Sequence, residues 1–451
     1  QDTQDTGGDD PVYTEPVTAL ISDSGNERFM VVDLASGDIY WTWDMREQHP
    51  DECMPDEGLE CGAYGASHRL DPDSGEDLFT FTWHRMDVED ATAIGSRQSR
   101  IERIRLGAEG HQIDWSLEHL DFQSVLADSG ICGAETACEA PTDAGQQAWM
   151  DCSMVMVHDV EIIREGPNEV EMWLADTANS RAIRVRLPTD STCGVVEEVL
   201  DADTTPEGDW DQFTWVNDID RVQIDGEERL LVTSKGSDSF VPAAHGRGKL
   251  TMWEPAETGW SLEWEFPPRD AESASFLNAP HNADWVFLDG EHYVVYGHSN
   301  GAGTHFEDET WTPTEDHLGS MGVLRLGADG PDYLGEYILA PGELGFTRDV
   351  DRMEDGSWII TDSGCKGELG CPKDSSIRHV MLPFTSLEAT GQDGRFHASG
   401  MSQTYIEATE LDTHWPSPRL CGLAAAYESD PITLLGTGLG AQQASPESSC
   451  E

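Results

Sequence analysis

Three basic residues in this sequence, His158, His281 and Arg348, each open a phrase of similar composition, and a related phrase opens with Asn217. Imidazole and guanidinium groups that converge on one point can bind sulfate, phosphate or a metal, and a histidine can act as an acid or a base near neutral pH. His158, His281 and Arg348 are therefore the candidate catalytic residues if the protein is an enzyme.

An acidic or amide residue follows each of these positions, namely Asp159, Asp218, Asn282 and Asp349. Two or three carboxylates and backbone carbonyl groups arranged around an axis form a site for a hard cation. These four residues are the candidate metal ligands, and the acidic composition of the chain makes calcium the expected ion.

The phrases themselves have the pattern of two strands joined by a hairpin. In "VEMWLAD" and "ERLLVTS" apolar residues dominate, as expected for strands that are buried on both faces, and a glycine near the middle of each phrase supplies the turn. Third and fourth strands follow, for example "GKLTMWEP" and "GWSLEWEF" after the phrase that opens at Asn217. Each repeat is thus expected to be a sheet of four strands.

The repeats begin near residues 68, 158, 217, 281 and 348, which is the spacing of β-propeller blades. A sixth unit is divided between the two ends of the chain. The sequence therefore predicts an all-β, six-bladed β-propeller with four-stranded blades, closed by strands near Thr18–Leu34 and near Leu420–Leu435. The expected organisation is an extended acidic arm at 1–16, a single propeller at 17–440 and a tail at 441–451.

In a propeller, the first strand of each blade lines the central channel, so the opening residues of these strands should meet around the axis. They are His68, His158, Asn217, His281, Arg348 and His414. The second strands should end beside them, at His84, Asp176, Lys235, His298 and Asp362. An alternative needs no chemistry at all, because the walls of a water-filled channel are polar in any case.

The 87 acidic and 26 basic residues give a formal net charge of −61. Such a charge repels nucleic acid and anionic lipid and attracts divalent cations, basic partners and cationic surfaces. No apolar run approaches the length of a membrane span, so no transmembrane segment is expected. A solvated acidic surface, suited to salty or calcium-rich surroundings, explains the charge equally well.

The ten cysteines predict disulfides in an oxidising compartment, since their spacing does not match that of zinc sites. The expected pairs are Cys53–Cys61, Cys132–Cys138, Cys365–Cys371, Cys152–Cys193 and Cys421–Cys450. The sequence begins with Gln1 and shows no signal peptide. A processed, exported protein would explain this beginning, as would a shortened sequence.

Two phrases carry a resemblance to known families. "HDVEIIREGPNEVEMWLADTANSRAIRV" resembles the blades of NHL-type propellers, and "FTWVNDIDRVQIDGEERLLVTSKGSDS" resembles secreted bacterial arylsulfotransferase-like propellers. The latter resemblance implies six blades with histidines and an arginine in the central funnel, which His158, His281 and Arg348 would supply. Asn217 departs from this pattern, and no extended catalytic motif matches.

Two hypotheses about function follow. In the first, the protein is a secreted or cell-surface, non-catalytic propeller that binds ions, a cationic partner or carbohydrate. Its disorder-prone arm at 1–16 would then contact a neighbouring copy and build filaments. In the second, it is a secreted arylsulfotransferase-like enzyme. A deep funnel that brings His158, His281 and Arg348 within reach of one ligand would favour the second hypothesis.

Overall fold

The computed structural model describes most of the chain between residues 18 and 407. The described stretches are 18–23, 26–33, 38–54, 58–71, 74–87, 98–107, 110–118, 122–123, 154–177, 179–188, 194–200, 215–235, 248–257, 259–266, 280–288, 290–298, 320–327, 330–338, 347–352, 358–362, 376–380, 395–397 and 402–407. The predicted arm at 1–16, the closing strands near Leu420–Leu435 and the tail at 441–451 lie outside these residues. Ring closure and self-association through the arm therefore stay predictions.

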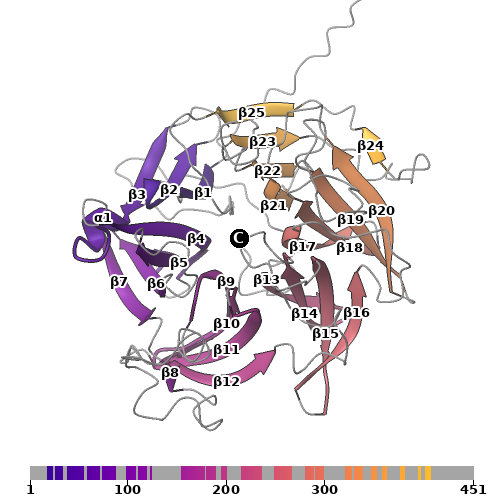
Figure 1. The fold of residues 1–451 in the computed structure, drawn as a ribbon, viewed down its shortest axis with the longest axis horizontal. Helices are drawn as coiled ribbons and strands as arrows, with labels where there is room; N and C mark the ends of the chain where they lie inside the picture. The colour runs from indigo at the N-terminus through magenta and orange to yellow at the C-terminus, as the bar shows by residue number, and fades with distance from the viewer. Residues whose placement is uncertain are drawn as a thin grey trace, which may run out of the picture.

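The described chain is almost entirely β-structure, as predicted, and its six antiparallel sheets lie around a common centre like the blades of a propeller (Figure 1). The first sheet contains β1 (Thr18–Asp23), β2 (Arg28–Asp33) and β3 (Ile39–Asp44), and is followed by a short helix, α1 (Met45–Gln48). The second contains β4 (Leu59–Leu70), β5 (Asp77–Asp87), β6 (Gln98–Gly107) and β7 (Gly110–Glu118). The third contains β9 (Val157–Glu165), β10 (Glu169–Asp176), β11 (Arg181–Pro188) and β12 (Gly194–Leu200), with β8 (Phe122–Gln123) added in parallel at its edge.

The remaining sheets repeat this plan. The fourth contains β13 (Val216–Ile224), β14 (Glu227–Ser234), β15 (Lys249–Pro255) and β16 (Trp260–Phe266). The fifth contains β17 (Pro280–Leu288), β18 (Glu291–His298), β19 (Ser320–Gly327) and β20 (Gly330–Ile338), with β24 (Arg395–His397) added in parallel. The sixth contains β21 (Thr347–Arg352), β22 (Trp358–Asp362), β23 (Ser376–Val380) and β25 (Ser402–Glu407).

The core consists of apolar layers between neighbouring sheets, since both faces of each inner strand are covered. Ile219 of β13, for example, packs with Trp173 and Ala175 of the preceding sheet. Val350 of β21 packs with Val286 and Val295 of the fifth sheet in the same way. This arrangement explains why the second strands β10 and β14 are buried over five consecutive residues rather than on alternate residues.

The three-stranded first sheet begins with its second strand. β1 packs against β4, the innermost strand of the following sheet, just as the second strands β10 and β14 pack against β13 and β17. The innermost position beside β1 is therefore filled by none of the strands that the structure describes. This agrees with the predicted division of one blade between the two ends of the chain.

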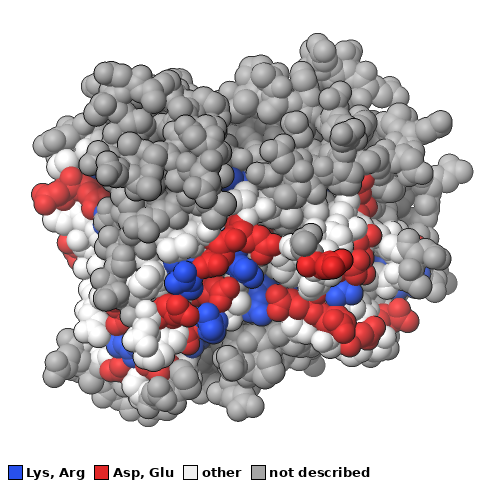
Figure 2. All heavy atoms as spheres, turned by 90° about the horizontal axis from the view of Figure 1, so that it is seen from below, with Lys and Arg blue, Asp and Glu red and all other residues white. Residues whose placement is uncertain are grey.

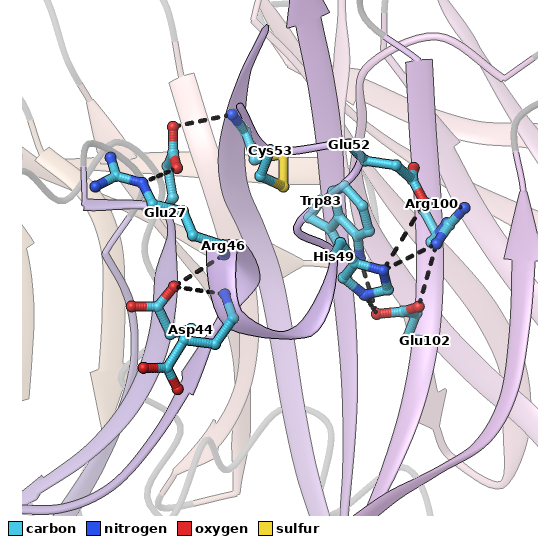
Figure 3. Close-up of a disulfide and its surroundings, with 11 residues drawn as sticks. Glu27, Asp44, Arg46, His49, Glu52, Cys53, Trp83, Arg100 and Glu102 are labelled. Atoms are coloured by element: carbon cyan, nitrogen blue, oxygen red, sulfur yellow. Dashed lines mark hydrogen bonds and ion pairs between the residues drawn. A yellow bond between two sulfur atoms is a disulfide. The ribbon is translucent and has the colours of Figure 1, made fainter. Parts of the chain in front are cut away.

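Of the five predicted disulfides, Cys53–Cys61 is present, and the cysteines of the other four pairs lie outside the described residues. A buried polar network lies beside it (Figure 3). Arg100 approaches Nδ1 of His49 at 3.2 Å and can only donate, so Nδ1 accepts. The opposite nitrogen, Nε2, then donates to Glu102 at 2.9 Å. This network anchors the segment after α1 to the second sheet.

The outer wall carries acidic and basic side chains side by side (Figure 2). Arg164 pairs with Glu169 at 2.9 Å, and Arg325 pairs with Asp332 at 3.1 Å. Exposed pairs of this kind contribute little to the free energy of unfolding, typically about 0–1 kcal/mol each. They nevertheless neutralise part of the negative charge locally.

An ion pair recurs in two sheets where the second strand ends and the third begins, a position that we call the corner. Asp23 lies opposite Arg28, and Asp176 lies opposite Arg181; both ion pairs measure 2.7 Å. In the fourth sheet the same pair of positions holds Ser234 and Lys249. Burial lowers the pKa of Lys249 to about 8, although the charge of Glu265 acts in the opposite direction.

We expect Lys249→Met to stabilise the protein at pH 7 by on the order of 1–3 kcal/mol. The pKa of Lys249 is lower in the folded chain than in the unfolded chain. The cost of charging this amine in the folded state is therefore fully present below about pH 8 and is lost as the pH rises toward 10.5. Urea unfolding between pH 7 and 10 should show wild-type stability rising relative to the variant.

Ser234→Asp is the matched substitution, because it restores the carboxylate of the two related corners. This variant should raise the pKa of Lys249 and flatten the same pH dependence. If the free energies of unfolding of wild type and Lys249→Met differed by the same amount from pH 7 to 10, this account of the corner would be contradicted.

Candidate functional site

Five residues occupy equivalent positions on the innermost strands of five sheets: Tyr64, His158, Asn217, His281 and Arg348. We call this group the axial ring. The pairing of each inner strand with its neighbour shifts register at this point. β-Bulges of this kind re-aim a side chain and often lie beside functional sites. The three predicted catalytic residues are thus structurally equivalent.

His68 is not a member of the ring, and the prediction for the second sheet was wrong. β4 starts at Leu59, so His68 lies near the far end of this strand. There Nε2 of His68 bonds Asp77 at 2.8 Å. Tyr64 takes the expected place, and it was missed because the phrases were aligned on their histidines. Counting back from the hairpin after Leu70 would have identified it.

Arg348 and His281 are in direct contact. Nη1 of Arg348 lies 2.6 Å from Nε2 of His281, and the two residues are 4% and 0% exposed. A guanidinium group can only donate hydrogen bonds, so Nε2 of His281 must accept this one. The ring of His281 is then neutral, with its proton on Nδ1.

The second nitrogen of His281 fixes the orientation of Asn217. The amide nitrogen of Asn217 is placed 2.9 Å from Nδ1 of His281, which would set two donors face to face. Rotation of the amide by half a turn exchanges its oxygen and nitrogen, and only the oxygen can accept from Nδ1–H. The other amide position, buried and without a hydrogen-bond partner among the described residues, then holds the NH₂ group of Asn217.

Tyr64 and His158 form the other part of the ring. Tyr64 stacks on both His158 and His84, with ring centroids 4.4 Å apart in both cases. Nδ1 of His158 lies 2.8 Å from the carbonyl oxygen of Met156, which can only accept. In the neutral state of His158 the proton is therefore on Nδ1, and the lone pair is on Nε2.

His158 is surrounded by positive groups. Burial is the largest cause that lowers the pKa of His158 well below 6.5, and the hydrogen bond to Met156 opposes it. The charges of Lys235, His84 and Arg348 lower the pKa further. These groups are close enough to act on one another electrostatically, so the centre of the molecule concentrates basic residues in a chain whose net charge is −61.

Two of the carboxylates that follow the ring bind backbone amides. Asp218 accepts a hydrogen bond from the N–H of Ala283 in the next sheet at 2.9 Å, and Asp349 accepts one from the N–H of Val350 at 3.1 Å. Asp159 is 4% exposed, and Asn282 is partly exposed. The structure therefore distributes the four predicted metal ligands over four inner strands.

Only Asp349 of these four belongs to a group of potential ligands. Among the described residues, Asp284, Asp349 and Asp351 form the one group of at least three such side chains whose ligand atoms all lie within 4.8 Å of one another. Asp284 and Asp351 were missed, although an acidic residue recurs two positions after Asn282 and Asp349 in the phrases "HNADW" and "RDVDR".

The predicted ends of the second strands lie at the same end of the sheets as the ring. His84 and Asp176 are buried, and Asp176 forms the ion pair with Arg181. Lys235 directly follows β14 and lies over the ring of Trp215, at 5.4 Å from its centroid. His298 and Asp362 end β18 and β22, and His414 lies outside the described residues.

Comparisons with known proteins identify no family. No family model matches the chain, and no curated protein matches it. Solved structures with partial likeness include a protein from Lactobacillus plantarum, with 10% identity, a TM-score of 0.38 and coverage of 86% of this chain and 99% of that one. An α-L-arabinofuranosidase from Lactobacillus brevis has 11% identity and a TM-score of 0.34, with 79% of this chain and 94% of that one covered.

A third solved structure, a single-residue mutant of a levansucrase from B. megaterium, has 11% identity and a TM-score of 0.34, with coverage of 88% of this chain and 90% of that one. Likeness at this level supports no conclusion about activity, and the propeller assignment is based on the sheets themselves. The resemblance to NHL-type and arylsulfotransferase-like propellers stays a prediction. Within the described residues, no helix is long and apolar enough to cross a membrane.

His158 should make the folded state sensitive to mild acid. Because its pKa is lower in the folded chain than in the unfolded chain, stability should be lost as the pH falls through about 6.5 toward the folded-state pKa. The free energy of unfolding of the wild type should fall by up to about 1.4 kcal/mol per pH unit in this range. We expect His158→Asn, which retains a donor toward Met156, to abolish this decrease. Urea unfolding of both proteins at pH 7.5, 6.5 and 5.5 measures this pH dependence. If the free energy of unfolding changed with pH equally in the two proteins, the assignment to His158 would be contradicted.

Proposed function

We propose that this chain is an exported, six-bladed β-propeller that binds the anionic group of a small ligand at its axial ring, without catalysing its conversion. The proposal is carried by the Asn217 amide, whose NH₂ group is buried in the ring without a hydrogen-bond partner among the described residues. A buried donor that is left unpaired is costly, and an acceptor on a ligand would satisfy it.

Charge favours an anion as that acceptor. Arg348 and Lys235 both act electrostatically on the buried His158. Two neighbouring cations and a buried amide donor suit a carboxylate, sulfate or phosphate group. The nearby carboxylates of Asp218 and Asp349 are directed to backbone amides, which limits their repulsion of an incoming anion.

Two further parts of this proposal concern the whole molecule. The disulfide Cys53–Cys61 supports an extracellular or cell-surface location, because disulfides persist mainly in oxidising compartments. The position of β1 as a second strand supports closure of a sixth blade by a strand near Leu420–Leu435.

A binding experiment tests the proposal. Calorimetric titration of the full chain with sodium sulfate and sodium phosphate at pH 7 should show binding that Arg348→Met and Asn217→Leu each weaken by roughly tenfold or more. Arg325→Met is the matched control, since this arginine is exposed and paired with Asp332 at 3.1 Å. Binding that is absent in the wild type, or equal in all variants, would refute an anion site in the ring.

A second candidate function is group transfer of the arylsulfotransferase-like type. One observation favours it: neutral His158 has its lone pair on Nε2, which is the arrangement of a general base beside the positive charge of Arg348. Incubation of the full chain with an aryl sulfate and a phenol acceptor distinguishes the two functions. Transfer that His158→Asn abolishes while sulfate still binds would replace the binding proposal with the enzyme.

A further inference from the structure

A group of three carboxylates comes from the innermost strands of the fifth and sixth sheets and includes no residue of the axial ring. Asp284 is on β17, and Asp349 and Asp351 are on β21; one carboxylate oxygen of each lies within 4.8 Å of the others. Asp349 and Asp351 are only 4% and 3% exposed. Since like charges this close in a poorly hydrated site repel strongly, the group favours a compensating cation.

A buried hydroxyl group on the neighbouring strand points independently to a ligand. Thr361 of β22 is directly opposite Asp349 in the antiparallel pair, so the two side chains are neighbours on the same face of the sheet. Thr361 is 1% exposed, and its hydroxyl oxygen has no hydrogen-bond partner in the described part of the chain. An uncharged oxygen on a residue opposite one of these carboxylates can serve as an additional ligand of a hard cation.

We propose that Asp284, Asp349, Asp351 and Thr361 bind one calcium ion, which joins the fifth and sixth sheets. All four residues offer hard oxygen atoms, and calcium takes six to eight such ligands in a flexible geometry. Magnesium fits less well, because it keeps several waters and is usually held by one or two carboxylates. The site shares only Asp349 with the ligand set expected from the sequence.

The ion would act on stability because its ligands come from two sheets. β17 and β21 are adjacent inner strands, and their sheets share the apolar layer around Val286 and Val350. An ion bound by both strands opposes their separation and stabilises the folded chain by mass action. Removal of the ion leaves three mutually repelling carboxylates at the same contact. The site does not depend on any ligand of the axial ring.

Melting curves of the full chain in 150 mM NaCl test the proposal, recorded with chelator and with increasing calcium or magnesium. We expect the wild-type Tm to rise with calcium and to rise much less with magnesium at the same concentration. Asp351→Asn should abolish this calcium-dependent rise. In chelator, the same variant should be at least as stable as the wild type, because one of the repelling charges is gone.

Two further variants make the result specific. Thr361→Val removes only the hydroxyl oxygen and should weaken calcium binding, shifting the half-maximal rise in Tm to higher calcium by roughly tenfold. Asp220→Asn is the matched control and should retain the full rise. Asp220 is also buried on an inner strand, at the position equivalent to Asp284 and Asp351, but lies outside the carboxylate group.

Either of two results would overturn the proposal. One is a wild-type Tm that calcium leaves unchanged. The other is a calcium-dependent rise in Tm that is as large in Asp351→Asn and Thr361→Val as in the wild type. Such a result would mean that calcium binds elsewhere, on the acidic surface. Sulfate binding at the axial ring is a separate measurement on other residues, so failure of one proposal does not imply failure of the other.

Discussion

The rest of the structure depends on how buried polar side chains at the centre are satisfied. Each innermost strand that the structure describes places one polar or aromatic residue at its bulge, and several of these residues form hydrogen bonds or stack with residues of neighbouring sheets. Arg348 fixes the tautomer of His281, and His281 in turn fixes the amide of Asn217. Because an unpaired buried donor or acceptor is costly, these contacts hold the sheets in one relative arrangement.

The same constraint connects the fold with the proposed functions. The centre of the molecule collects Lys235 and Arg348 of the axial ring near a buried neutral histidine, while the carboxylates of the next residues face backbone amides or one another. The bulge at Arg348 interrupts the regular alternation of β21 and re-aims this side chain. One short inner strand, β21, can therefore contribute Arg348 to a proposed anion site and Asp349 and Asp351 to a proposed cation site.

Much of this arrangement could be predicted from the sequence, because repeated phrases report directly on repeated sheets. The four phrases that open at His158, Asn217, His281 and Arg348 identified four inner strands, and the N-terminal sheet was expected to begin with a second strand, which is how β1 packs. The pair Cys53–Cys61 was predicted correctly from its spacing. The nearly all-β fold follows from the same patterns.

Other features depend on contacts that spacing does not encode. Tyr64 was missed because β4 extends several residues before the recognisable phrase, so the histidine at position 68 was taken as the first residue. Asp284 and Asp351 come together only because β17 and β21 are neighbours, and Thr361 joins them only through the register of β21 with β22. The tautomer of His281 requires both of its partners to be known.

The most direct test of this account is a double-mutant cycle on Arg348 and His281. The single variants Arg348→Met and His281→Leu and their combination would be compared with the wild type by urea unfolding of the full chain. Because each partner left alone is a buried, unsatisfied polar group, we predict a coupling of about 1.5–3 kcal/mol between the two sites. Additive effects, with a coupling below about 0.5 kcal/mol, would contradict the claim that this contact organises the centre of the propeller.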